Sequence, residues 1–533
     1  MRPRTLVASA LLVLGAGGVA LAVHAAAPTT PIHGRPGGVL KVLTREDLTQ
    51  GFLIHESSTL STIWPAQPCF NGLLMFDPMK PLETLDTVMP DLAEKWSWQD
   101  GYRNLVFFLR RDVKWHDGTP FTSRDVKFTF DMVREASDAA QKLRINPRKE
   151  WYDNVEAIEA AEPHTVVFRL KRPQTSLLLM LASGDSPVLP AHVPIAEQRT
   201  RCVGTGPFRL KEWKRGEYVD YVRNPDYFVK SRPYLDGIRY LVVIERSTRT
   251  AALQAGRADV ASPGDGGPQI AEQLRSAVPG MVITRVGINF ADHLLFNHTK
   301  PPFNDVRMRR ALSLGMDRAG FVQAVLQGGG VPGSALAPPP IGLWGLTGKD
   351  LPRGHDKARA RALLAEAGYG PGNPLKLDVI TRNLAIYRDG AAFVMDNLRQ
   401  LGVEGTLRMI ETPQWYGVTT RREFQFGSSI AGYGVDDPDS ILSESFLCKS
   451  ARNYQGYCDE EVDKLIAQQS QELDSRKRQA LLVRIQRKIE DDAARPVLSW
   501  RYDYFAHWPQ VKNLVPHHTP YSYGRMQDVW LDR

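Results

Sequence analysis

The chain has 533 residues and a formal net charge of +8, with 43% hydrophobic and 24% charged residues. A single hydrophobic core rarely serves more than about 250–300 residues, so we expect at least two lobes. The composition is typical of folded globular proteins and excludes a disordered chain or a multispanning membrane protein. No interleaving of aromatic and basic residues follows the basic run at Arg307, Arg309 and Arg310. Nucleic acid is therefore not an expected partner.

Residues 1–25 are predicted to be a cleaved secretory signal peptide. Two arginines precede an uncharged apolar stretch over residues 6–23, and Val23 and Ala25 fit the −3 and −1 positions of a cleavage site. The mature chain should begin at Ala26. Cleavage removes two arginines and no acid, so the net charge falls from +8 to +6. An uncleaved anchor is the alternative, because an apolar stretch of this length just reaches across a bilayer.

The first half of the chain predicts short strands and one well-defined strand–turn–helix unit. Strands are expected at 39–43 and 105–109, with a turn at 114–119. Thr122 fits a helix N-cap three residues before Asp125. The apolar residues that follow recur at spacings of four and three, which places them on one helical face: Val126, Phe130 and Val133. Further on, we expect a turn at 204–208, a helix at 248–256, and strands at 218–223, 241–244 and 257–260.

The second half predicts a partly parallel sheet. A strand at 375–380, a helix at 391–401 and a strand at 403–409 follow one another, which is the order of a βαβ crossover. Helices are also expected at 306–316, 356–367 and 474–492.

Four cysteines in an exported chain favour disulfide bonds. The short spacing between Cys448 and Cys458 predicts one bridge, and Cys69 with Cys202 is the remaining pair. No pair of cysteines has the spacing of a redox motif or a structural zinc site, so no metal or other cofactor is expected.

Residues 109–128 carry a resemblance to a known family, with Trp115-His116-Asp117-Gly118-Thr119 at their centre. This stretch resembles the signature of the peptide/nickel-binding class (family 5) of ABC-transporter solute-binding proteins. Further matches follow the same order along the chain, at 71–78, 204–208, 241–260 and 296–311.

The resemblance implies an α/β fold, a two-lobe clamshell of the type II-like periplasmic binding proteins. An extra subdomain would belong to lobe I, and ligand would be enclosed in a cleft between the lobes. The implied ranges are 36–287 plus 501–533 for lobe I, about 70–200 for its subdomain and 288–500 for lobe II, with hinge crossings near 286–290 and 499–501.

Ligand contacts are implied in the same way. Peptide-binding relatives hold the ligand's amine with an aspartate three residues before a triplet that is Asp437-Pro438-Asp439 here, and that position is Gly434. Asp436 or Asp437 could substitute for the missing carboxylate, although both also suit a loop turn. Arg382 lies near the place where dipeptide-binding relatives grip the ligand's carboxylate, and an interlobe or surface salt bridge is the alternative.

Aromatic residues could cover apolar parts of a ligand. Trp64, Trp415 and Tyr433 are expected on loops that face the cleft, with plain core packing as the alternative. His517 and His518 are adjacent near the C-terminus without a metal-ligand set, so they are expected on the surface.

Together these features predict the periplasmic substrate-binding component of an ABC importer. It would be a monomer without enzymatic activity that captures a small solute, a peptide or peptide-like compound, and delivers it to permease subunits in the inner membrane. A nickel chelate, an oligosaccharide or another metabolite is the alternative cargo, and a sensing subunit is a further alternative. A secreted hydrolase is remote because no serine fits GxSxG, although paired carboxylates of a glycosidase are not excluded by spacing.

Overall fold

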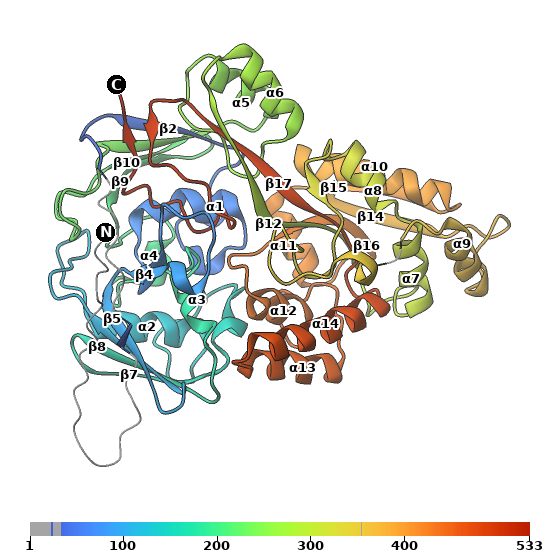
Figure 1. The fold of residues 1–533 in the computed structure, drawn as a ribbon, viewed down its shortest axis with the longest axis horizontal. Coiled ribbons are helices and arrows are strands. Elements are labelled where there is room, and N and C mark those ends of the chain that lie inside the picture. Colours follow the sequence, from blue (N-terminus) through green and yellow to red (C-terminus); the bar gives the residue numbers. More distant parts are fainter. Residues whose placement is uncertain (1–22, 25–32, 353) are drawn as a thin grey trace, which may run out of the picture.

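The computed structural model describes residues 23–24, 33–352 and 354–533. Two bodies of mixed helix and sheet lie side by side, and β12 (Val282–Phe296) and β17 (Val497–His507) run from one into the other as paired antiparallel strands (Figure 1). This is the expected two-lobe α/β arrangement. The predicted signal peptide lies outside the described residues except for β1 (Val23–His24), which pairs with a strand of the first lobe.

The first lobe contains a four-stranded sheet in the order β2-β11-β10-β9, in which only β2 and β11 are parallel. The strand expected at 241–244 begins earlier and ends at Val242, because its pairing with β2 and β10 starts at Gly237. The strand expected at 257–260 is reduced to single bridges at Val260. The elements of this part are β2 (Val39–Thr44), β9 (Phe208–Lys214), β10 (Tyr218–Arg223), β11 (Gly237–Val242), α1 (Leu60–Ala66), α4 (Ile195–Gln198), α5 (Arg246–Gln254), α6 (Pro268–Ala277), β18 (Val511–Lys512) and β19 (Trp530–Leu531).

A second, antiparallel sheet of the first lobe has the order β1-β5-β6-β8-β7 and is covered by α2. The predicted strand–turn–helix unit is present: Thr122 and Asp125 form a capping box, and Phe130 of α2 packs edge-on against Phe168 of the sheet. The elements are β3 (Leu74–Phe76), β4 (Val88–Pro90), β5 (Ala93–Gln99), β6 (Asn104–Leu109), α2 (Ser123–Val133), β7 (Val155–Glu162), β8 (Thr165–Leu170) and α3 (Leu177–Ala182). Short 3-10 turns occur at Ile54–Glu56, Gln67–Cys69, Leu85–Thr87, Lys149–Tyr152 and Gly348–Asp350.

The second lobe is built on a six-stranded sheet in the order β13-β17-β12-β16-β14-β15. β14 (Lys376–Arg382), α10 (Ala385–Gln400) and β15 (Glu404–Ile410) form the expected βαβ crossover, with β14 and β15 parallel. The crossover helix begins at Ala385, several residues earlier than its apolar pattern indicates. The remaining elements are α7 (Val306–Gly315), α8 (Arg318–Ala324), β13 (Gly330–Val331), α9 (Lys357–Glu366), α11 (Thr412–Thr420), β16 (Phe426–Gly432), α12 (Pro438–Phe446), α13 (Glu460–Gln471) and α14 (Ser475–Asp491).

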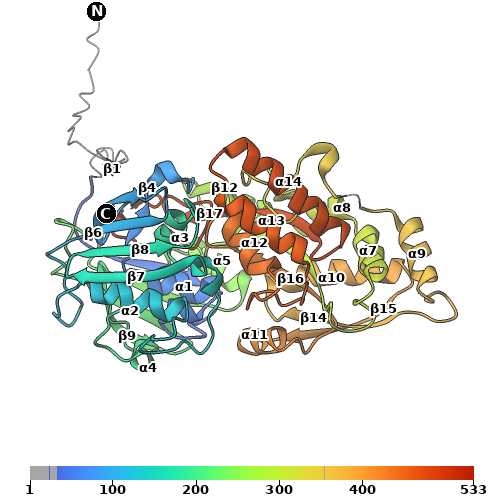
Figure 2. The same cartoon turned by 90° about the horizontal axis from the view of Figure 1, so that it is seen from below.

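The two lobes contact each other closely beside the paired strands. In Figure 2, α12, α13 and α14 stack against the body that contains α3. Asp439 of α12 is buried and accepts hydrogen bonds from Ser176, which precedes α3, and from Gln174. Hydrogen bonds across this boundary therefore hold the lobes together. Among the described residues, no helix is both long enough and apolar enough to cross a membrane.

Candidate functional site

A polar cavity lies between the two lobes. It spans about 570 Å³, part of which is open to solvent, and only about 40 Å³ of it is wide enough for water. That space holds a few water molecules, so a larger ligand requires the walls to move apart. The lining side chains combine basic and aromatic residues: Arg45, Phe290, His293, Arg382, Tyr387, Trp415, Tyr416, Arg452, Tyr454, Arg495 and Tyr521.

Strand ends and short loops bring these residues together. Arg45 directly follows β2, and Arg382 is the last residue of β14, so both stand at the carboxyl ends of strands in parallel pairs. Ligands of open α/β sheets bind at such ends. Arg45 and Tyr521 come from the first lobe. The other three arginines, Arg382, Arg452 and Arg495, come from the second lobe. Closing the lobes therefore completes the site.

Arg382 lies in the cavity wall, where it also bridges the lobes. Its guanidinium donates to Glu46 at 3.1 Å, to Thr412 at 2.7 Å and to the Tyr387 hydroxyl at 2.7 Å, and only 4% of the residue is exposed. Its Nε is buried without a hydrogen-bond partner. The interlobe ion pair of Arg382 is therefore present, and its contact with a ligand's carboxylate stays a prediction.

The three aromatic candidates differ in position. Trp415 lines the cavity, whereas Tyr433 lies outside its lining and receives a hydrogen bond from Arg495 at 3.3 Å. Trp64 is not a cleft residue: it is 1% exposed in α1, with its ring edge-on to Tyr240 at 5.6 Å. Every residue of α1 is buried, so Trp64 lies in the core instead of on a loop.

Neither Asp436 nor Asp437 lines the cavity. Asp437 caps α12 and accepts two hydrogen bonds from Arg478, at 2.7 and 3.0 Å. Asp436 lies 3.5 Å from His518. Both carboxylates therefore have structural partners, in agreement with the loop alternative.

The expectation of surface histidines near the C-terminus is wrong. His517 and His518 are 1% and 4% exposed. His517 lies 3.3 Å from the buried carboxylate of Glu83. Glu83 and Asp436, both distant in sequence, are the partners of His517 and His518 and make the burial of the two imidazoles possible.

Three cavity arginines were not predicted from the sequence: Arg45, Arg452 and Arg495. Arg495 donates to Ser445 at 2.9 Å and to His293 Nε2 at 3.0 Å. Burial, and after it the charge of Arg495, lowers the pKa of His293, so its ring is neutral and accepts this bond. Arg45 has one usable signal, because a charged residue directly after a predicted strand stands at a sheet's ligand-binding edge.

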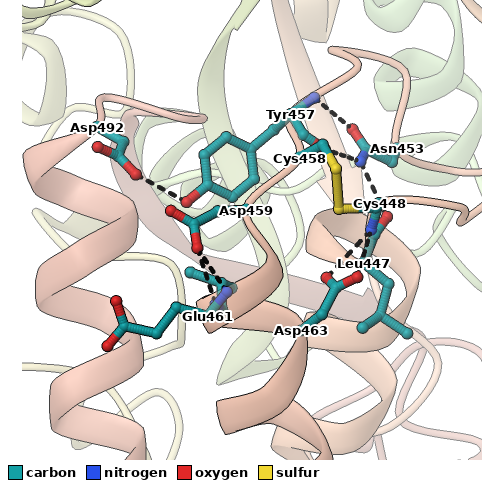
Figure 3. The surroundings of a disulfide bond; sticks show 10 residues. Leu447, Cys448, Asn453, Tyr457, Cys458, Asp459, Glu461, Asp463 and Asp492 are labelled. Atoms are coloured by element: carbon teal, nitrogen blue, oxygen red, sulfur yellow. Dashed lines mark hydrogen bonds between the residues drawn. A yellow bond between two sulfur atoms is a disulfide. The ribbon is translucent and has the colours of Figure 1, made fainter.

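Arg452 and Tyr454 reach the cavity from a loop between Cys448 and Cys458. Figure 3 shows the disulfide bond that closes this loop. Within this loop Asn453 donates to the carbonyls of Leu447 and Tyr457, at 3.0 and 2.6 Å. The other bridge joins Cys69 to Cys202, so no described cysteine is free. The covalent closure and the Asn453 bonds fix the loop that presents Arg452.

Replacing Cys448 and Cys458 with serine is expected to lower the free energy of unfolding by about 2–3 kcal/mol, the loop-closure value for a separation of 10 residues. Urea titration of the variant measures it. The two bridges of the parent protein are checked by alkylation without reductant followed by mass spectrometry. The parent should take up no alkyl groups, because all four cysteines are paired. Four added groups would contradict both bridges.

Glu150 joins the lobes from the 3-10 turn at Lys149–Tyr152, which contacts α12. Its carboxylate accepts a hydrogen bond from the backbone N–H of Ala451 at 2.9 Å. Burial raises the pKa of Glu150 to about 7, against 4.5 for a free side chain. The folded state therefore binds a proton between about pH 4.5 and 7 that the unfolded state has released, so this group makes stability fall as pH rises through that window.

Glu150→Gln should remove this dependence. The variant should gain stability at pH 8, by as much as about 2–3 kcal/mol, and match the parent near pH 4.5. Urea titrations at pH 4.5, 6 and 8 measure the difference. Glu156→Gln, at an exposed position of β7, is the matched control. A constant difference between parent and Glu150→Gln across these pH values would contradict the assignment.

Two lobes joined by paired strands around a polar cavity define the class of extracytoplasmic solute-binding proteins. The chain belongs to the bacterial extracellular solute-binding proteins, family 5, whose "Middle" model matches residues 87–453. Di/tripeptide-binding protein 2 of Pseudomonas aeruginosa is 27% identical over 448 residues, 79% of this chain and 82% of that protein.

Solved structures share the fold. The periplasmic binding protein DppA of Helicobacter pylori, in complex with the peptide STSA, has a TM-score of 0.83 at 22% identity and covers 94% of this chain and 99% of its own. AgaA of A. tumefaciens R10, in complex with agropinic acid, has a TM-score of 0.82 at 20% identity, with coverages of 93% and 99%. One fold therefore encloses peptide and non-peptide ligands in these neighbours.

Proposed function

We propose that this protein captures a peptide or peptide-like solute outside the inner membrane and delivers it to the permease subunits of an ABC importer. The observation that carries the proposal is the cavity between the lobes, lined by residues of both. A ligand that contacts both walls favours the closed form, and a permease can distinguish closed from open. The relative named for di- and tripeptides supports a peptide as cargo.

The proposal includes export and a division into lobes. The signal peptide would be removed after Ala25, and the mature protein would act as a periplasmic monomer. Lobe I would comprise 36–287 and 501–533, with a subdomain at about 70–200, and lobe II 288–500. The register of β12 against β17 shifts between Ile288 and Ala291, which supports a hinge there.

A non-peptide solute is the second candidate. Gly434 offers no carboxylate for a ligand's amine, and this favours cargo without a free amino terminus. Hydrolysis has no support in a family of binding proteins.

A melting-temperature screen of the purified protein tests the cargo. A ligand at a hundred times its Kd stabilises the native state by about 2.7 kcal/mol. Peptides, sugars, nickel chelates and aromatic metabolites form the panel. Stabilisation by peptides supports the first candidate, and stabilisation by non-peptides alone overturns it. Chemical turnover of a bound compound would overturn the binding function.

A further inference from the structure

The charged residues that line the interlobe cavity are all basic. Four arginines and the neutral His293 line it, and no aspartate or glutamate does so among the described residues: the arginines are Arg45, Arg382, Arg452 and Arg495. Because like charges in a space of low dielectric repel strongly, such a set needs compensation from nearby acids or from a ligand.

Nearby acids compensate two of the four. Arg382 pairs with Glu46 at 3.1 Å, and Arg452 pairs with Glu444. Arg495 contacts no carboxylate among the described residues and donates to two hydroxyls and a neutral imidazole. Four guanidinium charges against two carboxylates leave a local excess of two positive charges.

Arg45 is the most exceptional of the set. It is 5% exposed, and its Nε and Nη1 are buried without a hydrogen-bond partner. No ion pair joins it to a described carboxylate. A buried guanidinium without partners costs several kcal/mol, and a bidentate anion is the group that its fork of N–H donors fits.

Among the described residues, no carboxylate lines the cavity to pair with a cationic group of the ligand. At Gly434, where peptide-binding relatives have their aspartate, an added Cβ would lie 1.8 Å from the Asp185 carboxylate. Asp185 accepts a hydrogen bond from Arg148 at 2.6 Å, and both are at most 2% exposed. The nearest substitute carboxylate is therefore already bound to a guanidinium and stands outside the cavity lining.

We propose that the solute carries two acidic groups, held by Arg45 and Arg495, and that no free amine is needed for its recognition. This rests on the solute-binding function proposed above and narrows its substrate to a class. The chemistry shared by the possible ligands is a pair of carboxylates on a compact carbon skeleton. Part of that skeleton would pack against Trp415 and Tyr416, which form the adjoining wall. An acidic peptide and a non-peptide dicarboxylate are the two sources.

Matched compounds separate the sources. Melting temperatures would be measured with Ala-Glu, its amide counterpart Ala-Gln, N-acetyl-Ala-Glu, glutarate and its monoamide, each at 10 mM and constant ionic strength. We expect each compound with two carboxylates to stabilise more than its amide partner, and N-acetylation to retain the effect. If Ala-Glu stabilises the protein and glutarate does not, the solute is an acidic peptide. If glutarate stabilises it and Ala-Glu does not, the solute is a non-peptide dicarboxylate.

The failures are distinguishable. If Ala-Gln or sugars stabilise and no compound with two carboxylates does, the charge inference is wrong while solute binding stands. If no compound of this panel or of the wider screen binds, both are wrong.

Arg45→Gln ties the effect to the cavity. It should weaken binding of the stabilising dianion at least about tenfold, as loss of charge-assisted hydrogen bonds does, without lowering the melting temperature of the protein alone. Arg169→Gln is the matched control, because Arg169 pairs with Glu159 on the exposed face of the antiparallel sheet. Equal affinity of Arg45→Gln and the parent for that dianion would overturn the proposal.

Discussion

Replacing Asp292 with alanine is expected to lower the free energy of unfolding by about 3–5 kcal/mol. Asp292 lies on β12 and accepts from Arg501 of β17 through Nε at 2.7 Å and Nη2 at 2.6 Å, while Ser499 donates to it at 2.7 Å. The two charged side chains are 4% and 10% exposed. Without Asp292, the Arg501 charge stays buried and uncompensated, which is the most costly way to break a buried pair.

Two variants accompany this measurement by urea titration. Lys376→Ala breaks a solvent-exposed pair with Glu404 and should cost less than about 1 kcal/mol. Asp292→Ala combined with Arg501→Met should recover much of the loss, because an apolar replacement removes the orphaned charge. A loss below about 1 kcal/mol for Asp292→Ala alone would show that water reaches Arg501.

The pair also stabilises the junction of the lobes. The ladder between β12 and β17 is regular from Val282 to Ile288 and shifts register before Ala291. Asp292 and Arg501 lie on either side of this irregularity in the backbone pairing. Their ion pair thus joins the two strands at the point where the proposed hinge would flex.

Elements with a local signal were predictable from the sequence. The capping box of Thr122 and Asp125 marks the start of α2, since both partners lie within one turn. The βαβ order in the second lobe follows from the periodicity of adjacent segments. The contacts of β12 were not predictable in this way: one strand of 15 residues pairs with β16 and β17, both far along the chain.

The site was predictable only in part, because its chemistry depends on which charges meet after folding. Arg382 was proposed through the resemblance, because it lies near the place where dipeptide-binding relatives grip the ligand's carboxylate. Nothing local to Arg495 shows that it lacks a carboxylate, since that property belongs to residues such as Ser445 and His293. Trp64 was misplaced because an aromatic residue in a short apolar helix has the same local pattern in a core and in a cleft.

Gly434→Asp is expected to weaken binding of the stabilising ligand by about a hundredfold, equivalent to about 3 kcal/mol. It would place a side chain where Asp185 stands, since a Cβ on residue 434 lies 1.8 Å from Asp185 Oδ2 and 3.2 Å from Ser183 Oγ. Overpacking and a second carboxylate beside one Arg148 both oppose closure. Calorimetric titration measures the affinity, and small-angle scattering should show a larger radius of gyration.

Gly372→Asp is the matched control, because no atom lies within 4 Å of a Cβ at that position, and its affinity should equal the parent's. An unchanged affinity for Gly434→Asp would contradict the close contact between Gly434 and Asp185.

A double variant separates sterics from charge at the same contact. Gly434→Asp with Asp185→Gly returns a single carboxylate to the neighbourhood of Arg148 and removes the clash. If the lobes close on this pairing, the double variant should regain most of the affinity that Gly434→Asp loses, as coupled neighbours do in a double-mutant cycle. If it regains none, the carboxylate must come from the first lobe. Arg148 and Asp185 would then form an ion pair that is already in place before the lobes close. Gly434 can pack against this pair because it has no side chain.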